Sequence, residues 1–574
     1  MKASDYIAAF LDEQGVTHVF ELVGGMITHM LDSLNRQGRI SIVSLHHEQA
    51  AAFAAEGFGR MKGVPGVALA TSGPGATNLL TAIGSCYFDS TPAVFLTGQV
   101  NRSELRGARP VRQLGFQETD IVSMALPITK ASWRVDDPED IPSLLAQAFS
   151  TALSGRPGPV LLDIPMDLQR ADISIAGPPH PEAPADVRRP DPDLIRQLLN
   201  DLRRARRPII LAGGGLRSGR AVDPFREFVN RVQAPVVHSL LAVDALPAAH
   251  PLRVGMIGSY GNRWANLAMG RSDFVLVLGS RLDIRQTGSE TDAWKGDRLV
   301  YHVDVEEGEI NNRVHGCIGV TADLPSFLQE ALQEAANLTA APASDWLGEI
   351  SDLRRLWPDT AEQKGIHGIN PNELMHSLSA LSLQASAYVV DVGLHQMWAA
   401  QSLELTDRQR FLTSGGMGSM GFALPAAIGA VFAEPGAPVV VIAGDGGFQV
   451  NIQELQTVVR NGLPLKMVVI NNRCLGMVRQ FQQSYFDGRY QSTLWGYSAP
   501  DFSVVADAYG IESATVKEPA GLQAGLSAMW RDDTAPFLLQ VMIDTYANAY
   551  PKIAFGLPMT EMEPFAQPLE MEGT

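Results

Sequence analysis

Short hydrophobic runs alternate with longer amphipathic stretches along most of the 574-residue chain. In the first third, the apolar runs are THVFELV, ISIVSL, VPGVALATS, TPAVFLTGQ and GPVLLDIP, and the segments between them have helical spacing. Strands that alternate with helices are typical of a parallel sheet covered on both faces. The pattern therefore predicts an α/β domain over residues 1–170.

The same alternation returns twice further along the chain. Residues 191–340 contain RPIILAGG, APVVHSL, DFVLVLGS and RLVYHVDV, and residues 365–548 contain SAYVVDV, APVVVIAGD, LKMVVINN and PFLLQVMID. Residues 171–190 lose the periodicity and are rich in Pro and Ala, which predicts a linker, and residues 549–574 are expected to be a surface tail. The predicted fold class is α/β, with three successive doubly wound parallel-sheet domains.

Composition narrows the classes of partner. The formal net charge is −17, and no basic cluster stands out that would neutralise phosphates, which argues against a nucleic-acid or anionic-membrane partner. A small acidic substrate would need local positive charge. The three cysteines, Cys86, Cys317 and Cys474, are far apart, and no apolar run reaches the length of a membrane span. These features predict a soluble cytoplasmic protein without a disulfide framework.

The segment GDGGFQVNIQELQTVVRNGLPLKMVVINN, residues 444–472, carries the most specific pattern. Asp445 and Asn472 each follow an apolar run, so both are expected at the carboxyl ends of parallel strands, where ligands collect. No GxxxxGK[ST] phosphate loop occurs in the chain. A carboxylate and an amide oxygen can share one Mg²⁺ that also accepts diphosphate oxygens. Taken separately, GDG also fits a simple turn and NN a helix cap.

This GDG and NN pattern resembles the thiamine-diphosphate signature, and its surroundings are most similar to the acetolactate synthase and pyruvate oxidase group. Further motifs of that group occur in the same order along the chain: HHEQAAAFAAEGFGR, TSGPGATN, TGQV, FQETDIV, GRPGPVLLDIP, GSRLDIRQTG, HQMWAAQ and TSGGMGSMGFALPAAIGA. The resemblance implies a pyrimidine-binding first domain, a central domain and a diphosphate-binding third domain. It also implies thiamine diphosphate and Mg²⁺ as cofactors.

The resemblance assigns catalytic roles to three residues of the first domain. Glu48, in VSLHHEQ, matches the glutamate that binds the pyrimidine ring and promotes its imino tautomer. The structural alternative for Glu48 is an acid favoured at a helix start by the helix dipole. Gln99 in TGQV and Gly25 in LVGGM match residues close to the reacting carbon.

The other cofactor contacts are implied residue by residue. Met420 matches the apolar wedge beneath the bent cofactor, and the carbonyl of Gly418 matches the partner of its amino group. The carbonyl of Cys474 is expected to join Asp445 and Asn472 as the third protein ligand of the metal. The diphosphate contacts carry over to Val392, Gly393, His395, Gly446, Gly447, Gly476 and Met477.

Three positions of the expected substrate pocket depart from the synthase pattern. The lysine after the DIP motif is Met166, the glutamine of the VGQHQMWA pattern is Leu394, and the tryptophan associated with 2-oxobutyrate as acceptor is Phe481. Val478 is expected to line the same pocket. These departures argue for an acceptor other than that of branched-chain biosynthesis, such as an aldehyde or a keto-sugar.

A flavin is the second open question. GSRLDIRQTG resembles the segment with which synthases of this group bind FAD for structural rather than redox reasons. The corresponding candidates are Arg156, Gly213, Gly214, Gly215, Arg281, Arg285, Asp304 and Asp323. The segment GMIGSYG lacks the Met-His pair of GMLGMHG, so a packed central domain without flavin stays an alternative.

The predicted function is an acetolactate synthase-like carboligase that decarboxylates pyruvate, or a related 2-oxoacid, and transfers the acyl group to a carbonyl acceptor. The alternatives are a 2-oxoacid decarboxylase, an aldehyde or 2-hydroxyacyl lyase, and a noncatalytic cofactor-binding subunit. Because the two halves of the cofactor site lie in different domains and relatives place it between subunits, the resemblance implies a homodimer or homotetramer. Glu48 is then expected to face Asp445 of the partner subunit.

Overall fold

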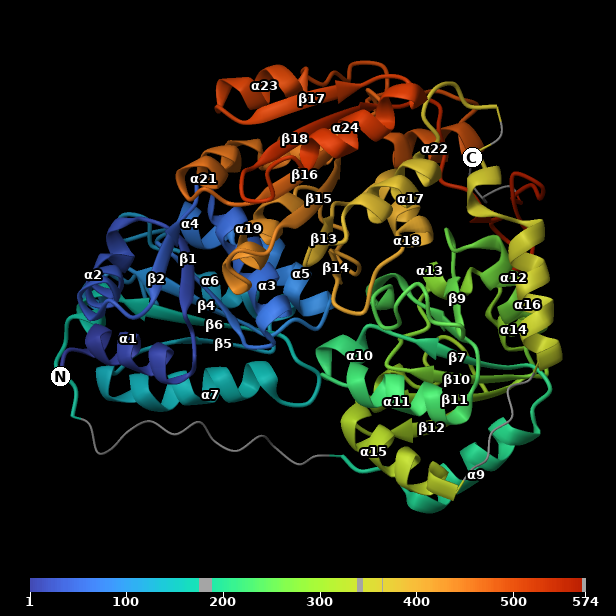
Figure 1. Ribbon diagram of the computed structural model, residues 1–574. Helices are drawn as coiled ribbons and strands as arrows, with labels where there is room; N and C mark the ends of the chain where they lie inside the picture. The colour runs from blue at the N-terminus through green and yellow to red at the C-terminus, as the bar shows by residue number, and fades with distance from the viewer. Residues whose placement is uncertain (175–187, 338–343, 364, 570–574) are drawn as a thin grey trace.

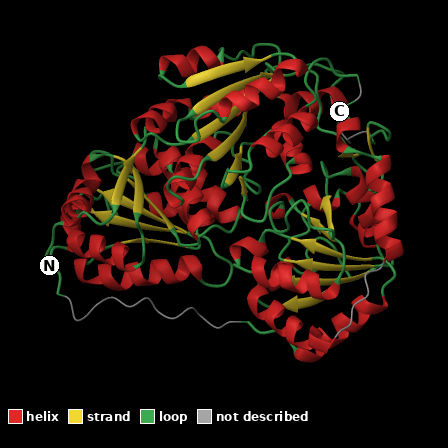
Figure 2. Ribbon diagram, viewed as in Figure 1, coloured by secondary structure: helices red, strands yellow, loops and turns green. Residues whose placement is uncertain are grey.

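The computed structural model describes residues 1–174, 188–337, 344–363 and 365–569. Within these residues the chain forms three six-stranded parallel sheets, each flanked by helices, so the predicted fold class is confirmed. Figures 1 and 2 show the first sheet on the left, the second at the lower right and the third above them. The predicted linker over residues 171–190 lies largely outside the described residues.

The first sheet has the strand order β2-β1-β3-β4-β6-β5. Its strands are β1 (His18–Leu22), β2 (Ser41–Ser44), β3 (Gly66–Ala70), β4 (Ala93–Gln99), β5 (Ala131–Arg134) and β6 (Pro159–Pro165). Its helices are α1 (Ala3–Glu13), α2 (Thr28–Gln37), α3 (Glu48–Lys62), α4 (Pro74–Asn78), α5 (Leu80–Phe88), α6 (Ile121–Ala125), α7 (Ile141–Leu153) and α8 (Met166–Gln169). The central strands β3, β4 and β6 are buried throughout, as expected for strands covered on both faces.

The second sheet has a different order, β12-β11-β10-β7-β8-β9. Its strands are β7 (Pro208–Ala212), β8 (Val236–His238), β9 (Arg253–Met256), β10 (Phe274–Leu278), β11 (Leu299–Asp304) and β12 (Ile318–Thr321). Its helices are α9 (Pro192–Arg204), α10 (Gly215–Ser218), α11 (Val222–Val232), α12 (Arg263–Arg271), α13 (Ile284–Thr287), α14 (Thr291–Lys295) and α15 (Leu324–Glu334), and α16 (Ser344–Leu356) packs against α12. The order reverses between β10 and β7, which is where doubly wound sheets bind ligands.

The third sheet, β14-β13-β15-β16-β18-β17, repeats the relative order of the first. Its strands are β13 (Ala387–Val390), β14 (Arg410–Thr413), β15 (Val439–Gly444), β16 (Leu465–Asn471), β17 (Glu512–Val516) and β18 (Phe537–Met542). Its helices are α17 (Pro371–Leu381), α18 (Leu394–Ser402), α19 (Ala423–Ala433), α20 (Asp445–Val450), α21 (Leu455–Arg460), α22 (Gly476–Tyr485), α23 (Phe502–Ala508) and α24 (Leu522–Met529). The first and third domains are therefore built on one topology.

Helices α3 and α19 join these two domains at close range. A Cβ atom on Gly57 would lie 2.0 Å from the carbonyl oxygen of Ala426, and one on Gly429 would lie 1.9 Å from that of Ala54. Only glycine permits such an approach of two helix backbones. The alanine-rich sequences of both helices thus create a tight contact that fixes the first sheet relative to the third.

The tail packs more closely than a surface segment. It forms a two-stranded antiparallel ladder of β19 (Lys552–Ile553) and β20 (Met562–Glu563). Ile553, Met559 and Met562 are buried in a cluster with the central domain. Among the described helices, none combines the length and apolarity that crossing a membrane requires.

Candidate active site

A cavity of about 100 Å³ opens where β13, β15 and β16 end. Parallel strands bring their carboxyl ends to one edge, so loops far apart in sequence meet there. The lining residues are Val392, Gly393, Leu394, His395, Trp398, Met420, Gly444, Asp445, Gly446, Gly447, Ile470, Asn472, Cys474, Leu475, Gly476, Met477 and Val478. This set includes every predicted metal ligand and every predicted diphosphate contact.

Asp445 places an unpaired carboxylate oxygen in this cavity. The residue follows β15, begins α20 and is 2% exposed. One carboxylate oxygen accepts a hydrogen bond from the Gly446 N–H at 3.0 Å, whereas Oδ2 is buried without a partner among the described residues. Burial raises the pKa of Asp445 to about 7, although the Gly446 N–H and the nearby Tyr497 hydroxyl oppose this shift. A buried, unpaired oxygen of this kind is suited to a cation.

Asn472 and Cys474 approach Asp445 from the end of the neighbouring strand, β16, which pairs with β15. The Asn472 side-chain oxygen accepts a hydrogen bond from the Cys474 N–H at 3.2 Å. The Cys474 thiol lies 3.4 Å from the Thr545 carbonyl, outside the predicted ligand set. Among the described residues no cluster of three His, Cys, Asp or Glu side chains could hold a metal. A metal here would therefore rely on one carboxylate, amide and backbone oxygens, and ligand phosphates, as Mg²⁺ commonly does.

The glycines of this edge give the cavity its floor. A Cβ atom on Gly446 would lie 2.5 Å from the Leu475 side chain, and one on Gly447 would lie 2.4 Å from the Asp391 carboxylate. A Cβ atom on Gly476, the first residue of α22, would lie 2.4 Å from Leu394. Bare backbone at the starts of α20 and α22 can approach an anionic ligand closely.

His395 and Asp391 hold the loop after β13. Burial lowers the pKa of His395 to about 3, so its imidazole is neutral, and Nε2 accepts a hydrogen bond from the Gly444 N–H at 3.3 Å. Asp391 accepts hydrogen bonds from the N–H groups of Val392, Gly421 and Ala423. The sequence prediction missed Asp391, although an acid directly after an apolar run, VVDVG, is the same signal as GDG.

The apolar candidates divide between the cavity and its rim. Met420 and Val478 line the cavity and are 38% and 51% exposed, and Leu394 is buried. Phe481 is 39% exposed on α22 and does not line the cavity; its ring packs against Tyr485 at 4.8 Å between centroids. Gly418 lies in the same loop as Met420 but does not line the cavity; its φ is +68°, and a Cβ atom there would have nothing within 4 Å.

Glu48 lies in the first domain and does not line this cavity. It begins α3 and is 7% exposed, and its Oε2 accepts a hydrogen bond from the Asn78 side chain at 2.9 Å. Oε1 lies close to Gly75, where a Cβ atom would be 3.2 Å away. Among the described residues, those lining the cavity all belong to the third domain. Glu48 is therefore not part of the cavity lining that one chain provides.

The remaining first-domain candidates surround the carboxyl ends of β4 and β6. Gln99 is buried, and its amide nitrogen donates to the Thr119 carbonyl and to Asp163 at 2.8 and 2.9 Å. Burial raises the pKa of Asp163 to about 7, although hydrogen bonds from Thr97 and Gln99 oppose the shift. Gly25 is exposed at the start of a single 3₁₀ turn. Met166 begins α8 directly after β6 and is partly exposed.

Three domain models of one protein family match successive parts of the chain. The model of the thiamine pyrophosphate enzyme N-terminal TPP binding domain matches residues 1–124, that of the central domain residues 195–331 and that of the C-terminal TPP binding domain residues 391–541. The acetolactate synthase large subunit of Lactococcus lactis is 36% identical over 561 residues, covering 97% of this chain and 95% of that protein. The acetolactate synthase isozyme 2 large subunit of Escherichia coli is 37% identical over 562 residues, covering 98% and 99%.

The chain belongs to the thiamine pyrophosphate enzyme family. It is an acetolactate synthase-like enzyme that depends on thiamine diphosphate, and the resemblance recognised from its motifs is confirmed.

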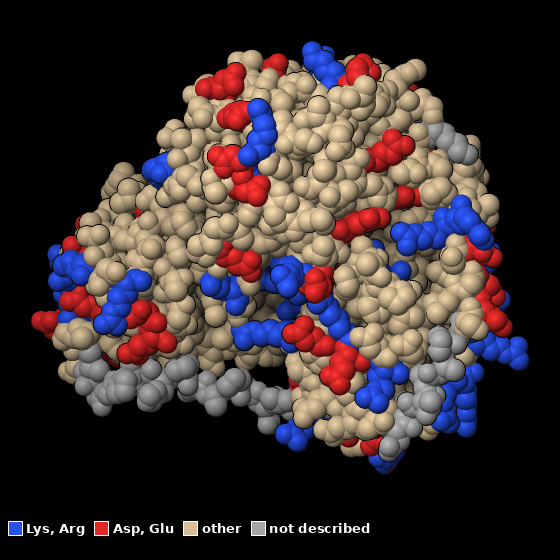
Figure 3. All heavy atoms as spheres, in the orientation of Figure 1, with Lys and Arg blue, Asp and Glu red and all other residues tan. Residues whose placement is uncertain are grey.

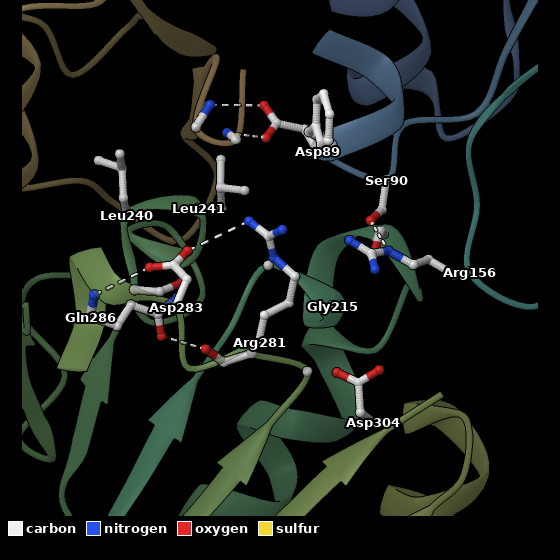
Figure 4. A pocket seen from close by; sticks show the side chains of 18 of the residues that line it. Asp89, Ser90, Arg156, Gly215, Leu240, Leu241, Arg281, Asp283, Gln286 and Asp304 are labelled. Atoms are coloured by element: carbon white, nitrogen blue, oxygen red, sulfur yellow. Dashed lines mark hydrogen bonds and ion pairs between the residues drawn. The ribbon is translucent and has the colours of Figure 1, made fainter. Parts of the chain in front are cut away.

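In this thiamine pyrophosphate enzyme a second cavity, of about 160 Å³, lies where all three domains meet. Figure 4 shows Asp89 from the first domain above Arg281, Asp283 and Asp304 from the central domain. Seven of the eight flavin candidates line it: Arg156, Gly214, Gly215, Arg281, Arg285, Asp304 and Asp323. Gly213 does not; a Cβ atom there would lie 2.1 Å from the Gly279 carbonyl oxygen, so this glycine serves close packing.

Among the described residues, four aspartates line this second cavity, and two of them, Asp304 and Asp323, have features that suit a ligand. Burial raises the pKa of Asp304 to about 6, although the Glu306 N–H and Arg156 oppose the shift. Asp323 caps α15 through the Ser326 N–H, while its Oδ2 is buried without a partner among the described residues. Arg156 donates to Ser90 at 2.8 Å and to the carboxylates of Glu306 and Glu309 at 2.7 and 2.9 Å. The cavity beside the central domain is therefore lined by both carboxylate and guanidinium groups.

Proposed function

We propose that this enzyme is a carboligase that decarboxylates pyruvate, or a related 2-oxoacid, and transfers the acyl-anion equivalent to a carbonyl acceptor. The observation that carries the proposal is the cavity of the third domain, which collects the unpaired Asp445 oxygen, Asn472 and the bare backbone of two helix starts. The acetolactate synthases of L. lactis and E. coli, similar over nearly the whole chain, support the reaction class.

In this proposal Asp445, Asn472 and the Cys474 carbonyl hold Mg²⁺, and Gly446, Gly447 and Gly476 receive the diphosphate. The orphaned Asp445 oxygen and the glycine floor fit these groups chemically. His395, Val392, Gly393 and Met477 would complete the contacts from the same edge of the sheet, and Met420, which also lines the cavity, would offer the cofactor an apolar contact.

When bound, thiamine diphosphate supplies the carbon nucleophile that attacks the substrate carbonyl. Glu48 holds and exchanges a proton at its carboxylate, oriented by the Asn78 amide. Gly25 and Gln99 border the place of reaction, and Met166, Leu394, Val478 and Phe481 shape the acceptor pocket. Since three of these four differ from the synthase pattern, we assign an aldehyde or keto-sugar acceptor ahead of a second 2-oxoacid.

We further propose that the active sites lie between subunits of a homodimer or homotetramer. Glu48 does not line the third-domain cavity of its own chain, which supports a second copy that brings Glu48 to Asp445 of the partner subunit. We assign residues 1–170 to pyrimidine binding, 191–340 to the central domain and 365–548 to diphosphate binding. The three cysteines are unpaired and buried, which supports a reducing, cytoplasmic location.

We also propose that FAD occupies the second cavity. Asp304, at the end of β11, is placed as ribose-binding acids are in doubly wound sheets, and Arg156, Arg281 and Arg285 suit the phosphates. Refolding the purified protein with FAD and measuring its absorbance spectrum and stoichiometry tests this assignment. A chain that takes up no flavin under these conditions would contradict it.

Product analysis tests the main proposal. The purified enzyme with thiamine diphosphate and Mg²⁺ is given pyruvate alone, then pyruvate with aldehydes or keto-sugars. We expect carbon dioxide release and a new hydroxyketone that contains the acceptor. Acetaldehyde as the sole product would instead identify a decarboxylase, and cofactor binding without consumption of any 2-oxoacid would identify a noncatalytic subunit.

A further inference from the structure

A loop rich in arginine leaves the first sheet at the end of β4. We call residues 101–118 the arginine loop: it contains Arg102, Arg106, Arg109 and Arg112, only two acids, and no lysine. This local excess of positive charge stands against a chain of net charge −17. The composition argument found no basic cluster, because four arginines spread over eleven residues do not form a run.

The arginine loop is held by internal hydrogen bonds. The Gly115 N–H donates to the Glu104 carbonyl at 2.8 Å, which closes the loop, and a Cβ atom on Gly115 would lie 2.9 Å from the Glu104 side chain. Glu118 accepts hydrogen bonds from the backbone N–H groups of Arg106 and Leu114 at 2.6 and 2.8 Å. Glu104 accepts one from the Asn101 N–H at 3.1 Å. Both acids of the loop therefore bind backbone, not guanidinium groups.

Three of the four guanidinium groups are exposed and lack an acidic partner. Across the described parts of the chain, Arg106, Arg109 and Arg112 form no ion pair, and Arg106 and Arg109 donate only to the carbonyls of Val111 and Leu105. Arg102 is different: its backbone N–H and Nε bind both oxygens of Asp167 at 2.9 and 2.8 Å. Arg102 thus anchors the loop, and the other three are free to bind an anion.

The ends of the arginine loop lie beside the substrate half of the active site. Gln99, at the end of β4, stands opposite Pro165 at the end of β6, and Asp167 directly follows Met166, where the synthase lysine is missing. At the other end, Gln117 packs against Gly73, where a Cβ atom would lie 3.0 Å from it. Gly73 precedes the turn whose Gly75 contacts Glu48. The two ends of the arginine loop are therefore anchored beside residues of the predicted active site.

We propose that the arginine loop binds a phosphate group carried by the acceptor substrate, through Arg106, Arg109 and Arg112. This inference rests on the proposed carboligase function and names its acceptor class. One guanidinium group can donate two parallel hydrogen bonds to two oxygens of a phosphate, which favours arginine over lysine for binding phosphate. The carboxylate of pyruvate is bonded to the reacting carbonyl carbon, so it cannot reach an exposed loop. A phosphate at the far end of a longer aldehyde or ketone can.

The first test compares one acceptor with and without phosphate. With pyruvate as donor, carbon dioxide leaves as the C1–C2 bond breaks, C2 bonds to the acceptor carbonyl carbon, and the acceptor oxygen takes up a proton. We expect kcat/KM for glyceraldehyde 3-phosphate to exceed that for glyceraldehyde by about tenfold or more, mainly through KM. In the variant Arg106→Gln/Arg109→Gln/Arg112→Gln this ratio should fall to about one.

A matched control carries the same change of charge elsewhere. Arg203→Gln/Arg204→Gln/Arg206→Gln replaces three exposed arginines at the end of α9 in the central domain and should keep the wild-type ratio. A wild-type ratio near one, or an unchanged ratio in the arginine-loop variant, would overturn the proposal. Preference for succinic semialdehyde over the phosphorylated aldehyde would also overturn it, in favour of a carboxylate.

A second measurement separates this proposal from the proposed function. Calorimetry with glycerol 3-phosphate and glycerol, on enzyme loaded with thiamine diphosphate and Mg²⁺, reports phosphate binding without turnover. Binding of glycerol 3-phosphate that disappears in the arginine-loop variant supports the loop even if pyruvate is not consumed. The competing explanation is that the three arginines bind a second copy of the chain. Analytical sedimentation tests it: if the arginine-loop variant dissociates into monomers while the control variant does not, the proposal fails.

Discussion

Single residues at the strand ends carry the chemistry of this enzyme. Asp445 and Asn472 could be selected from sequence because an acid and an amide directly after apolar runs are unusual, and parallel strands bring such positions together. The orphaned Asp445 oxygen could not be foreseen, since it depends on which groups the fold leaves out of reach.

Replacing Asp445 tests the metal assignment. Asp445→Asn removes the only carboxylate of the predicted site, so Mg²⁺-dependent binding of thiamine diphosphate should weaken by at least about tenfold. Titration calorimetry at fixed Mg²⁺ measures the change, with Asp407→Asn, an exposed acid, as control. Equal affinity in wild type and Asp445→Asn would rule out the assigned ligand.

Replacing Glu48 tests the proton-transfer role. Glu48→Gln keeps the shape and the contact with Asn78 but cannot exchange a proton, so carbon dioxide release from pyruvate should fall by about a hundredfold or more. Cofactor affinity should change far less, because the diphosphate contacts lie in the other domain. The exposed Glu434→Gln serves as control. Near-normal turnover in Glu48→Gln would contradict the proton-transfer role and would favour the alternative, that Glu48 only stabilises the start of α3.

At the scale of elements, and within the described part of the chain, the hydrophobic pattern predicted every interior strand of the three sheets but only one of their six edge strands, β2. The unpredicted strands β5, β9, β12, β14 and β17 are all edge strands. β5, β12 and β17 have mostly half-exposed residues, because one side of an edge strand faces solvent. Their sequences therefore lack the continuous apolar run that marks a strand buried on both faces.

The contact between α3 and α19 is expected to tolerate no added side chain. Gly429→Ala would place a methyl group 1.9 Å from the Ala54 carbonyl oxygen, which belongs to backbone and cannot move aside. The free energy of unfolding should fall by about 1–3 kcal/mol, as read from urea denaturation. Gly348→Ala in α16, where nothing lies within 4 Å, should be neutral or slightly stabilising. A Gly429→Ala protein as stable as wild type would show that the helices can separate.

The pair of His376 and Asp359 should make stability depend on pH. The hydrogen bond to Asp359, at 2.8 Å, raises the pKa of His376; burial alone would raise the pKa of Asp359, but its bond to His376 holds it below the usual value. The pair therefore stabilises the fold between these two pKa values. That contribution is lost as pH rises through the raised pKa of His376, and as pH falls through the lowered pKa of Asp359.

We expect His376→Gln to lower the urea midpoint at pH 6 and to differ much less from wild type at pH 8.5. The exposed His367→Gln provides the control. The same loss at both pH values would mean that His376 acts through packing and not through its charge.

At the scale of the whole molecule, charge is mixed and the active site is incomplete. Figure 3 shows acidic and basic side chains interspersed, with several near the junction of the first and central domains. The residues that line the third-domain cavity of one chain do not include Glu48, so they form only one half of the predicted cofactor site.

Mixing two inactive variants tests the shared site. If Glu48 of one subunit serves Asp445 of the partner subunit, a heterodimer of Glu48→Gln and Asp445→Asn has one intact site and one with both defects. Random re-association should then restore about a quarter of wild-type activity, measured as carbon dioxide release after joint unfolding and refolding. No recovery, with heterodimers verified by differential tagging, would place each site within a single chain.

The sequence by itself determined the three α/β units, the strand ends that bear Asp445 and Asn472, and the family. These depend on hydrophobic period and on spacing within short segments, which are local properties. Only the tertiary structure decided which strand ends meet, that Gly213 packs against backbone, and that Glu48 does not line the third-domain cavity. It also decided that Arg102 pairs with the distant Asp167. Those outcomes depend on contacts between residues far apart in the chain, which no local pattern records.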